Sequence, residues 1–284
     1  MQDLGYYNGT IGPLADMSIP MLDRACYFGD GVYEAVATKN HIPYALDEHI
    51  ERFFCSANLL RLSVPFSKEK LRDLLCSLIA KVDDGEQIAY WQLSRGVALR
   101  SHAFPTEPCT PSLMAMLQPF KLYNVANPIS AITVEDTRYL HCNIKTINLL
   151  PNIMAAQHAQ EANCFEAIFH RNGRVTECTR SNVHILKEGT LITAPADHFI
   201  LNGIARRHLL QACASLVIPY DERPYTLDEL MDADEIIITS TGSLGARVTT
   251  VDGKTVGGKA EVLLSALQNH MAARFLRATT PAAS

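Results

Sequence analysis

Helical and strand-like spacings of apolar residues alternate along the first part of the chain. In residues 46–64, apolar positions recur every three or four residues, which predicts an amphipathic helix with Asp47 as its N-cap. A second helix is predicted after Ser67, which is another residue type that favours helix N-caps. Alternating or continuous apolar runs bounded by turn residues predict strands in three stretches, at residues 31–44, 88–96 and 111–120.

The second part of the chain alternates hairpins with helices. A helix is predicted at residues 148–161, and a hairpin with an Asn-Gly turn is predicted at residues 165–177. A further helix is predicted to begin after Gly203, and an apolar strand leads into the polar cluster at residues 240–243. The terminal stretch RATTPAAS, residues 277–284, is expected to be disordered.

These elements predict an α+β protein with mixed, largely antiparallel sheets. A length of 284 residues is ample for two modest domains. We place a small N-terminal domain at residues 1–118, an interdomain connection at residues 119–128 and a larger C-terminal domain at residues 129–284. The connection is rich in turn-forming and polar residues, which is typical of a domain boundary.

Composition narrows the class of protein. Hydrophobic residues make up 48% and charged residues 19%, as in ordinary soluble globular proteins. The formal net charge of −5 disfavours a nucleic-acid or anionic-membrane partner. The sequence has no signal-peptide pattern and no long apolar run, and its eight cysteines lack any CxxC pair. We therefore expect a cytoplasmic protein with reduced thiols and no bound metal.

Lys145 and Glu177 are candidate catalytic residues at two predicted strand ends. A lysine between apolar neighbours is most often a surface residue whose amine reaches water. The alternative is a partly desolvated amine that attacks carbonyls and forms a Schiff base. Glu177 is either a solvated turn carboxylate that pairs with Arg174, or a buried carboxylate that faces a cationic ring nitrogen.

Several segments could bind anions. Gly203 directly precedes a predicted helix, and the exposed amides of a helix N-terminus attract phosphate. The hydroxyl-rich cluster at residues 240–243 could provide further donors. Arg52 lies on the polar side of its helix, where a local salt bridge is the simpler interpretation. Arg100 and His102 lie in a basic loop that could bind a carboxylate or be a solvated face.

The order of these features resembles the class IV, or fold-type IV, aminotransferases, and is closest to the D-amino acid aminotransferases. The resemblance covers nearly the whole chain. Its seven motifs are DRACYFGDGVYE (23–34), HIERF (49–53), SRGVALRSHAFP (94–105), IKTINLLPNIMA (144–155), EAIFHRNGRVTECTRSNV (166–183), NGIARR (202–207) and TSTGS (239–243). The resemblance implies a small α/β domain and a larger, barrel-like domain with a mixed sheet. It also implies a homodimer with shared active sites, because in the family the carboxylate-binding loop reaches the site of the other subunit.

The resemblance also implies the cofactor, pyridoxal 5′-phosphate, and the residues that bind it. Lys145 would form the Schiff base and move a proton in a 1,3-shift, while Glu177 would pair with the ring nitrogen. The phosphate would be held by Arg52, by the amides of Ile204 and Ala205, and by Ser240 and Thr241. Ala205 departs from the family pattern, which has a threonine at this position, so one phosphate hydrogen bond is lost.

On the substrate side, the resemblance implies that Tyr33 and Tyr90 line the pocket and that Arg100 and His102 bind the substrate carboxylate. The substrates implied are D-amino acids such as D-alanine and D-glutamate, with 2-oxoglutarate or pyruvate as acceptor. Arg180 stands where the family often has a small hydroxyl residue. A guanidinium there could bind a distal carboxylate, so we expect Arg180 to favour acidic substrates.

Four alternatives remain open at this point. An aminodeoxychorismate lyase would use the same cofactor and lysine for pyruvate elimination. A branched-chain L-aminotransferase or an (R)-amine transaminase would differ in a few substrate-contacting residues. A cofactor-binding or structural protein without catalysis would require Lys145 to have no chemical role.

Overall fold

The fold was analysed in a computed structural model that describes residues 1–107 and 109–281. Contacts divide the chain into two compact units. The first unit comprises Met1–Lys121, Ile144–Asn148 and the chain from Leu276 onward, and the second comprises Leu122–Asn143 and Leu149–Phe275. The sequence-based division assigns residues 144–148 to the C-terminal domain, whereas by contacts this short segment lies with the first unit.

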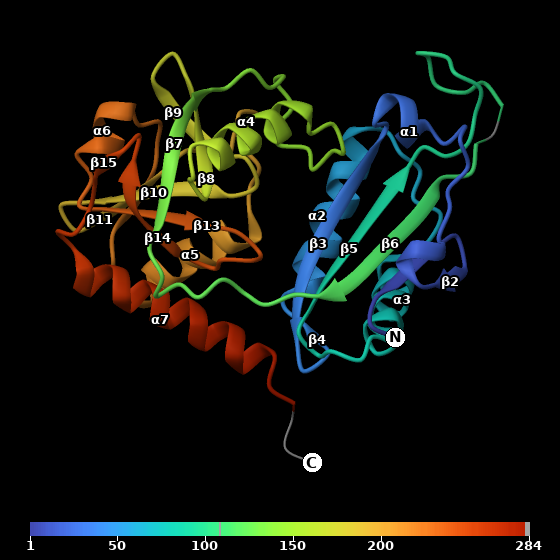
Figure 1. Cartoon of the computed structure of the whole chain (residues 1–284), viewed down its shortest axis with the longest axis horizontal. Helices are drawn as coiled ribbons and strands as arrows, with labels where there is room; N and C mark the ends of the chain where they lie inside the picture. Colours follow the sequence, from blue (N-terminus) through green and yellow to red (C-terminus); the bar gives the residue numbers. More distant parts are fainter. Residues whose placement is uncertain (108, 282–284) are drawn as a thin grey trace. The chain divides into compact units, whose positions relative to one another are not determined.

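The first unit is an antiparallel sheet covered by helices. Its six strands follow the order β2-β1-β6-β5-β3-β4. Figure 1 shows α2 alongside β3, where Phe53 of α2 packs against Trp91 of β5 at a ring-centroid distance of 6.0 Å. The elements are β1 (Leu4–Tyr7), β2 (Thr10–Gly12), α1 (Arg24–Phe28), β3 (Gly31–Lys39), β4 (Ile42–Pro43), α2 (Leu46–Leu59), α3 (Lys68–Ile79), β5 (Gln87–Ser94) and β6 (Ser112–Pro119), with a 3-10 turn at Leu14–Asp16.

The two predicted helix starts have different outcomes. Ser67 is the N-cap of α3, and its side chain accepts a hydrogen bond from the Lys70 amide, as predicted. The prediction for Asp47 is wrong, because Ala45 is the N-cap of α2 and has a left-handed conformation. The chain turns at Ala45 before the helix begins, so Asp47 lies in the first turn and forms an ion pair with Arg72 of α3.

The second unit is built on a nine-stranded mixed sheet. The strand order is β12-β11-β10-β13-β14-β7-β8-β9, with β15 beside β14, and the pairs β11–β12, β14–β7 and β7–β8 are parallel. β9 also contacts β10, so the sheet curls. The strands are β7 (Ile129–Glu135), β8 (Glu166–Arg171), β9 (Arg174–Cys178), β10 (Asn182–Lys187), β11 (Thr190–Thr193), β12 (Tyr220–Glu222), β13 (Glu235–Thr239), β14 (Ala246–Val251) and β15 (Lys254–Thr255).

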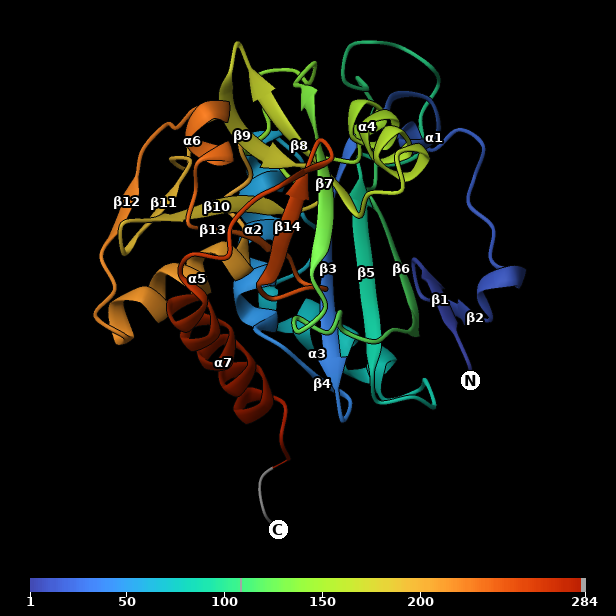
Figure 2. The ribbon, with the colours of Figure 1, turned by 60° about the vertical axis from the view of Figure 1, so that its left-hand side comes forward.

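Four helices accompany this sheet: α4 (Leu150–Glu161), α5 (Ile204–Ser215), α6 (Leu227–Met231) and α7 (Glu261–Ala278). Figure 2 shows α5 and α7 side by side. Leu209 of α5 and Leu267 of α7 belong to one buried cluster with Ile237 of β13, so both helices cover the same part of the sheet. Burial of such side chains contributes about 1.5–3 kcal/mol each.

The Asn-Gly hairpin and the C-terminal tail also have different outcomes. Asn172 and Gly173 both have positive φ angles, 49° and 81°, as expected of the two central residues of a tight hairpin turn. The tail prediction is wrong at its start, because Arg277 and Ala278 belong to α7. Residues 282–284 lie outside the described part of the chain. In the ranges that the structure describes, no helix combines the length and apolarity needed to cross a membrane.

Candidate active site

The segment around Lys145 pairs with the N-terminal part of β3 in the first unit. The Tyr33 amide donates a hydrogen bond to the Lys145 carbonyl oxygen at 2.9 Å. Thr146 forms a bridge with Val32, and the Lys145 amide donates to Ser56 Oγ of α2 at 3.2 Å. The backbone of Lys145 is therefore held by both a strand and a helix, although it belongs to neither.

The Lys145 side chain is half-buried and lies over an aromatic pair. Its Nζ is 4.2 Å from the centroid of the Tyr33 ring, within the range of a cation–π contact. Tyr33 stacks on Tyr90 at a centroid distance of 5.5 Å, and the Tyr90 hydroxyl donates to Gln92 Oε1 at 2.7 Å. Burial raises the pKa of Tyr90, which keeps its hydroxyl protonated. The structure thus brings together Lys145, Tyr33 and Tyr90.

Arg52 is oriented by a buried carboxylate that sequence analysis missed. Arg52 Nε donates to Glu34 Oε1 at 2.6 Å and Nη2 donates to Oε2 at 2.9 Å, while His49 Nδ1 lies 2.8 Å from the same Oε2. Burial would raise the pKa of Glu34, but the charges and hydrogen bonds of Arg52 and His49 lower it well below its ordinary value. Burial lowers the pKa of His49, and the charge of Lys145 acts in the same direction. The carboxylate partner lies on β3, not on the same helix.

Arg100 and His102 gather around one aromatic ring of the first unit. The guanidinium carbon of Arg100 lies 5.1 Å from the centroid of the Phe28 ring, and the His102 ring lies 5.1 Å from it on a tilted plane. Both side chains are exposed. The structure therefore places together the two residues that were predicted to bind a carboxylate.

In the second unit, Glu177 lies near the end of β9 and is a buried carboxylate with three hydrogen-bond donors. Arg138 Nη1 donates to Oε1 at 2.5 Å, and Oε2 accepts from Asn182 Nδ2 at 3.1 Å and from the Leu201 amide at 2.9 Å. Burial raises the pKa of Glu177, and the Arg138 charge opposes this effect. Arg138 is itself paired with buried Asp136 at 2.9 Å. The simpler interpretation, a solvated turn carboxylate paired with Arg174, does not hold, because Arg174 pairs with Asp197 instead.

Asn182 connects three parts of the predicted cofactor site. Its Nδ2 donates both to Glu177 and, at 2.9 Å, to the Leu201 carbonyl oxygen. It pairs in register with Thr239, the last residue of β13 before Ser240 and Thr241. Its Oδ1 lies so close to Gly203 that a Cβ on Gly203 would be 2.2 Å away. Glu177, the start of α5 and the end of β13 therefore converge on one side chain.

The start of α5 has the features of an anion site. Gly203 is the N-cap, and no side-chain hydrogen bond caps the helix within the described residues. The amides of Ile204 and Ala205 therefore lack a side-chain acceptor at the positive end of the helix dipole. The nearby turn is held by Ser240, whose Oγ accepts from the amides of Gly242 and Ser243 at 3.2 and 3.1 Å.

Arg180 lies on the turn between β9 and β10. Its side chain is 68% exposed, lies 5.3 Å from the centroid of the Phe165 ring and is 3.9 Å from buried Glu166. Glu166 also accepts hydrogen bonds from the hydroxyls of Thr179 and Ser181, the residues on either side of Arg180. The backbone of this turn is thus fixed while the guanidinium reaches solvent.

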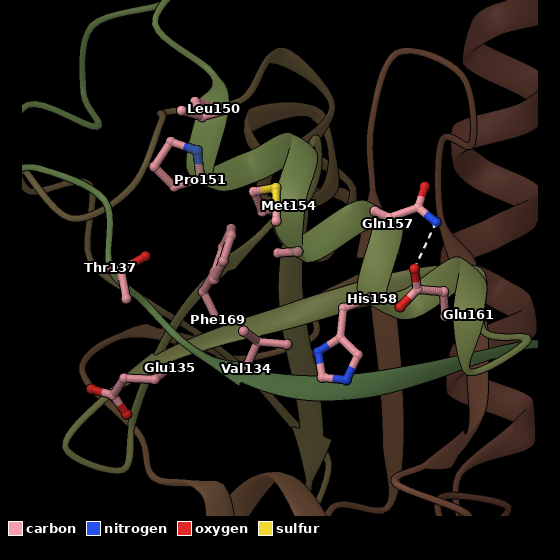
Figure 3. Close-up of a pocket in the computed structure, with 11 residues that line it drawn as sticks. Val134, Glu135, Thr137, Leu150, Pro151, Met154, Gln157, His158, Glu161 and Phe169 are labelled. Carbon is pink, nitrogen blue, oxygen red and sulfur yellow. Dashed lines mark hydrogen bonds between the residues drawn. The ribbon is translucent and has the colours of Figure 1, made fainter.

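A separate pocket of about 700 Å³ lies between α4 and the strands β7 and β8 (Figure 3). Figure 3 shows Pro151 and Met154 toward one end and Gln157, bonded to Glu161, toward the other. None of the predicted site residues lines this pocket. Across the described ranges there is also no cluster of His, Cys, Asp and Glu side chains suited to a metal ion.

Sequence comparisons agree with the resemblance found in the motifs. The profile of the family Amino-transferase class IV matches residues 31–251. A D-alanine aminotransferase of Bacillus licheniformis is 40% identical over 256 residues, covering 89% of this chain and 90% of that protein. A D-alanine aminotransferase of Staphylococcus aureus is 36% identical over 266 residues, covering 93% and 94%.

Structural comparisons show the same fold at low sequence identity. A branched-chain aminotransferase from Thermoproteus uzoniensis has a TM-score of 0.87 and 22% identity, with 98% of each chain covered. A branched-chain aminotransferase from Escherichia coli has a TM-score of 0.85 and 21% identity, covering 95% of this chain and 92% of that one. At these identities the likeness concerns the fold and not the substrate.

Proposed function

Because this chain belongs to the class IV aminotransferases and has their two-unit α+β fold, we propose that it transfers the amino group of a D-amino acid to a 2-oxo acid. The donors are of the D-alanine and D-glutamate type, and the acceptors are 2-oxoglutarate or pyruvate. Relatives at 36–40% identity named D-alanine aminotransferase support this choice over an L-amino acid enzyme.

Pyridoxal 5′-phosphate fits the residues of the second unit. The cofactor needs an anion site for its phosphate and a carboxylate for its protonated ring nitrogen. The observation that carries the proposal is that Asn182 joins these two features: its side chain bonds Glu177 and packs against Gly203 at the uncapped start of α5. Ile204, Ala205, Ser240 and Thr241 would hold the phosphate, together with Arg52.

When bound, the cofactor supplies an electron sink for the carbanion formed at the substrate Cα. Lys145 provides the amine that holds the cofactor and then accepts and returns the Cα proton at Nζ. Arg138 favours the ionised form of Glu177, so its carboxylate can accept a hydrogen bond from the ring N–H. Arg52, fixed by Glu34, keeps a guanidinium oriented for a phosphate oxygen.

Substrate orientation depends on residues of the first unit. Tyr33 and Tyr90 line the substrate side, and Arg100 and His102 bind the α-carboxylate. Lys145 would approach the bound cofactor from one face, so the position of the substrate carboxylate would decide which enantiomer presents its Cα–H to the amine.

The test compares D-alanine with L-alanine at equal concentration, using 2-oxoglutarate as acceptor and following pyruvate formation. We expect a rate with D-alanine at least about a hundredfold higher, which corresponds to about 2.7 kcal/mol of discrimination. Lys145→Ala should abolish this activity while retaining the fold by circular dichroism. A preference for L-alanine would exclude the proposed specificity.

We also propose that the protein is a homodimer in which the loop carrying Arg100 serves the site of the other subunit. Two adjoining segments of the first unit, joined by the hydrogen bond from Ala98 to Leu22, expose large apolar side chains. Such a concentration of exposed apolar surface favours an interface. The exposed residues are Ile19, Met21, Leu22, Val97, Leu99 and Phe104.

The eight cysteines, all free thiols, support a reducing compartment such as the cytoplasm.

A further inference from the structure

The ring of Phe28 contacts both members of the carboxylate-binding pair, Arg100 and His102. Phe28 is the last residue of α1, and its ring centroid lies 5.1 Å from the Arg100 guanidinium carbon and 5.1 Å from the His102 ring centroid. Because the side chains of Arg100 and His102 are exposed, few protein groups are placed to hold them. Stacking on the aromatic ring restricts the rotamers of both side chains while their polar groups stay hydrated.

Arg24, at the other end of α1, holds the backbone of the same pair. Its Nη1 donates to the carbonyl oxygen of Ser101 at 2.8 Å, and Ser101 is the residue between Arg100 and His102. Only 3% of the Arg24 side chain is exposed, and its Nε donates to Asp30 Oδ2 at 2.7 Å. One buried guanidinium thus links the loop to the start of β3.

The charge of Arg24 is balanced within a network that reaches α2. Arg95 shares Asp30, with contacts of 2.8 Å from Nε and 3.0 Å from Nη2, and also donates to the carbonyl oxygens of Leu60 and Arg61. Burial would raise the pKa of Asp30, but Arg95 and Arg24 lower it below its ordinary value. Because Asp30 stays ionised, buried Arg24 has a charged partner, which it shares with Arg95.

The loop is also tied down before the pair. The Tyr27 hydroxyl donates to the Ala98 carbonyl oxygen at 2.5 Å, and the Arg24 amide donates to the Gly96 carbonyl oxygen at 2.9 Å. Every residue of α1 that makes these contacts therefore faces the loop. The five-residue helix α1 therefore holds the loop through contacts with its backbone.

We propose that Arg24 and Phe28 are positioning residues for carboxylate recognition: Arg24 fixes the peptide between Arg100 and His102, and Phe28 fixes their side chains. This role rests on the proposed function, in which Arg100 and His102 bind the substrate α-carboxylate. Holding both groups in place before binding reduces the entropy lost when the carboxylate arrives. Neither Arg24 nor Phe28 contacts the substrate in this arrangement.

The experiment measures steady-state kinetics and ligand binding for Phe28→Leu, Arg24→Met and Arg24→Lys. We expect Phe28→Leu and Arg24→Met to raise KM for D-alanine about tenfold, equivalent to about 1.4 kcal/mol, with kcat within about twofold. Arg24→Lys keeps the charge beside Asp30 and should recover part of the loss. The Kd of propionate, a carboxylate without an amino group, should rise by the same factor in calorimetric titration, whereas the Kd of pyridoxal phosphate should stay unchanged.

Arg72→Gln is the matched control, because Arg72 of α3 forms an exposed ion pair with Asp47 of α2. A wild-type protein inactive on both alanine enantiomers would defeat the proposed function. An active wild type whose Phe28→Leu variant keeps its KM and propionate Kd would overturn the positioning role alone. If the variants instead lose catalytic rate, cofactor affinity and thermal stability to a similar extent, Arg24 and Phe28 have only a structural role. If Arg24→Met does not fold, Phe28→Leu decides.

Discussion

The Glu177 carboxylate receives its three hydrogen bonds from separate parts of the second unit: Arg138 after β7, Asn182 on β10 and the backbone of Leu201 before α5. Burial alone would favour the neutral acid, so the Arg138 charge is what favours the carboxylate. Asp136 in turn balances Arg138. Ionisation of Glu177 therefore depends on a residue that has no part in the family motifs.

This dependence predicts the effect of Arg138→Met. Without the guanidinium, the pKa of Glu177, already raised by burial, rises further, which favours the protonated carboxyl. A protonated carboxyl has no negative charge to stabilise a protonated ring nitrogen and forms a weaker hydrogen bond with its N–H, so pyridoxal phosphate should bind about tenfold more weakly at pH 7. Binding should recover as the pH rises above the new pKa. Absorbance titrations of cofactor between pH 6 and 9 would measure this.

Arg171→Met is the control for this substitution, because Arg171 pairs with the same Asp136 that balances Arg138. It removes a partly buried guanidinium from the same network. If both variants bind the cofactor with the same pH profile, the charge of Arg138 does not set the ionisation of Glu177.

Arg180 leads to a prediction about substrate choice. Its guanidinium is exposed while the neighbouring residues of its turn are bonded to Glu166, so it is available to a ligand without moving the backbone. Arg180→Ala should lower kcat/KM for D-glutamate by about fivefold and leave D-alanine within about twofold, as expected for the loss of one exposed charge pair. Parallel assays with both donors would check this, and an equal loss for the two would refute the proposed preference.

Sequence reasoning reaches Lys145 and Glu177 because each matches, within its motif, a residue to which the family resemblance assigns a role toward the cofactor. It does not reach Arg138, Asn182 or Glu34, whose importance arises only from contacts with distant residues. Glu34 is the clearest case: the sequence offers Arg52 acidic neighbours on its own helix, but the partner lies 18 residues away on β3. A buried position excludes water, so the strand carboxylate is favoured over an exposed helical one.

At the scale of the elements, the start of α5 is shaped by the neighbouring strand. Gly203 has an ordinary φ of −62°, so any residue could adopt its backbone conformation. The restriction is steric, because a methyl group at Gly203 would lie 2.2 Å from Asn182 Oδ1. Asn182 would then have to move away from Glu177 or from α5, although both contacts belong to the proposed cofactor site.

Gly203→Ala should therefore weaken pyridoxal phosphate binding by about ten- to a hundredfold and lower the free energy of unfolding by about 1–3 kcal/mol. Fluorescence titration of the cofactor and urea denaturation of the apoprotein would measure the two effects. Gly12→Ala is the matched control, since a methyl group there would meet Met17 at an ordinary 3.5 Å. Unchanged cofactor affinity in Gly203→Ala would show that the close packing on Asn182 has no functional role.

Local sequence signals predict a turn or a helix start well where that feature depends only on neighbouring residues. The Asn172-Gly173 turn and the Ser67 cap depend on residues within a few positions, and both are confirmed. The start of α2 depends on the left-handed Ala45, which no local preference indicates. Helix α7 is absent from the sequence-based prediction, although Leu264, Leu267 and Met271 form a helical stripe.

At the scale of the whole chain, the two units cannot be described by one boundary. The chain leaves the first unit after Lys121, returns for Ile144–Asn148 and returns again from Leu276. Sequence patterns predict the boundary within residues 119–128, because that connection is polar and rich in turns. Sequence patterns do not predict that the segment Ile144–Asn148 belongs to the first unit, because the pairing of Thr146 with Val32 joins residues far apart in sequence.

The proposed dimer makes a prediction that single variants cannot test. If Arg100 of one subunit serves the site of the other, a dimer of Lys145→Ala and Arg100→Ala subunits has one site with both defects and one site with neither. Randomly assembled mixtures of the two inactive variants should then recover about one quarter of the wild-type activity, because about half of the dimers are mixed and each has one intact site. Unfolding and refolding the variants together, followed by assay with D-alanine, would measure this. If Arg100 acts within its own subunit, every site carries one defect and the mixture is no more active than its components.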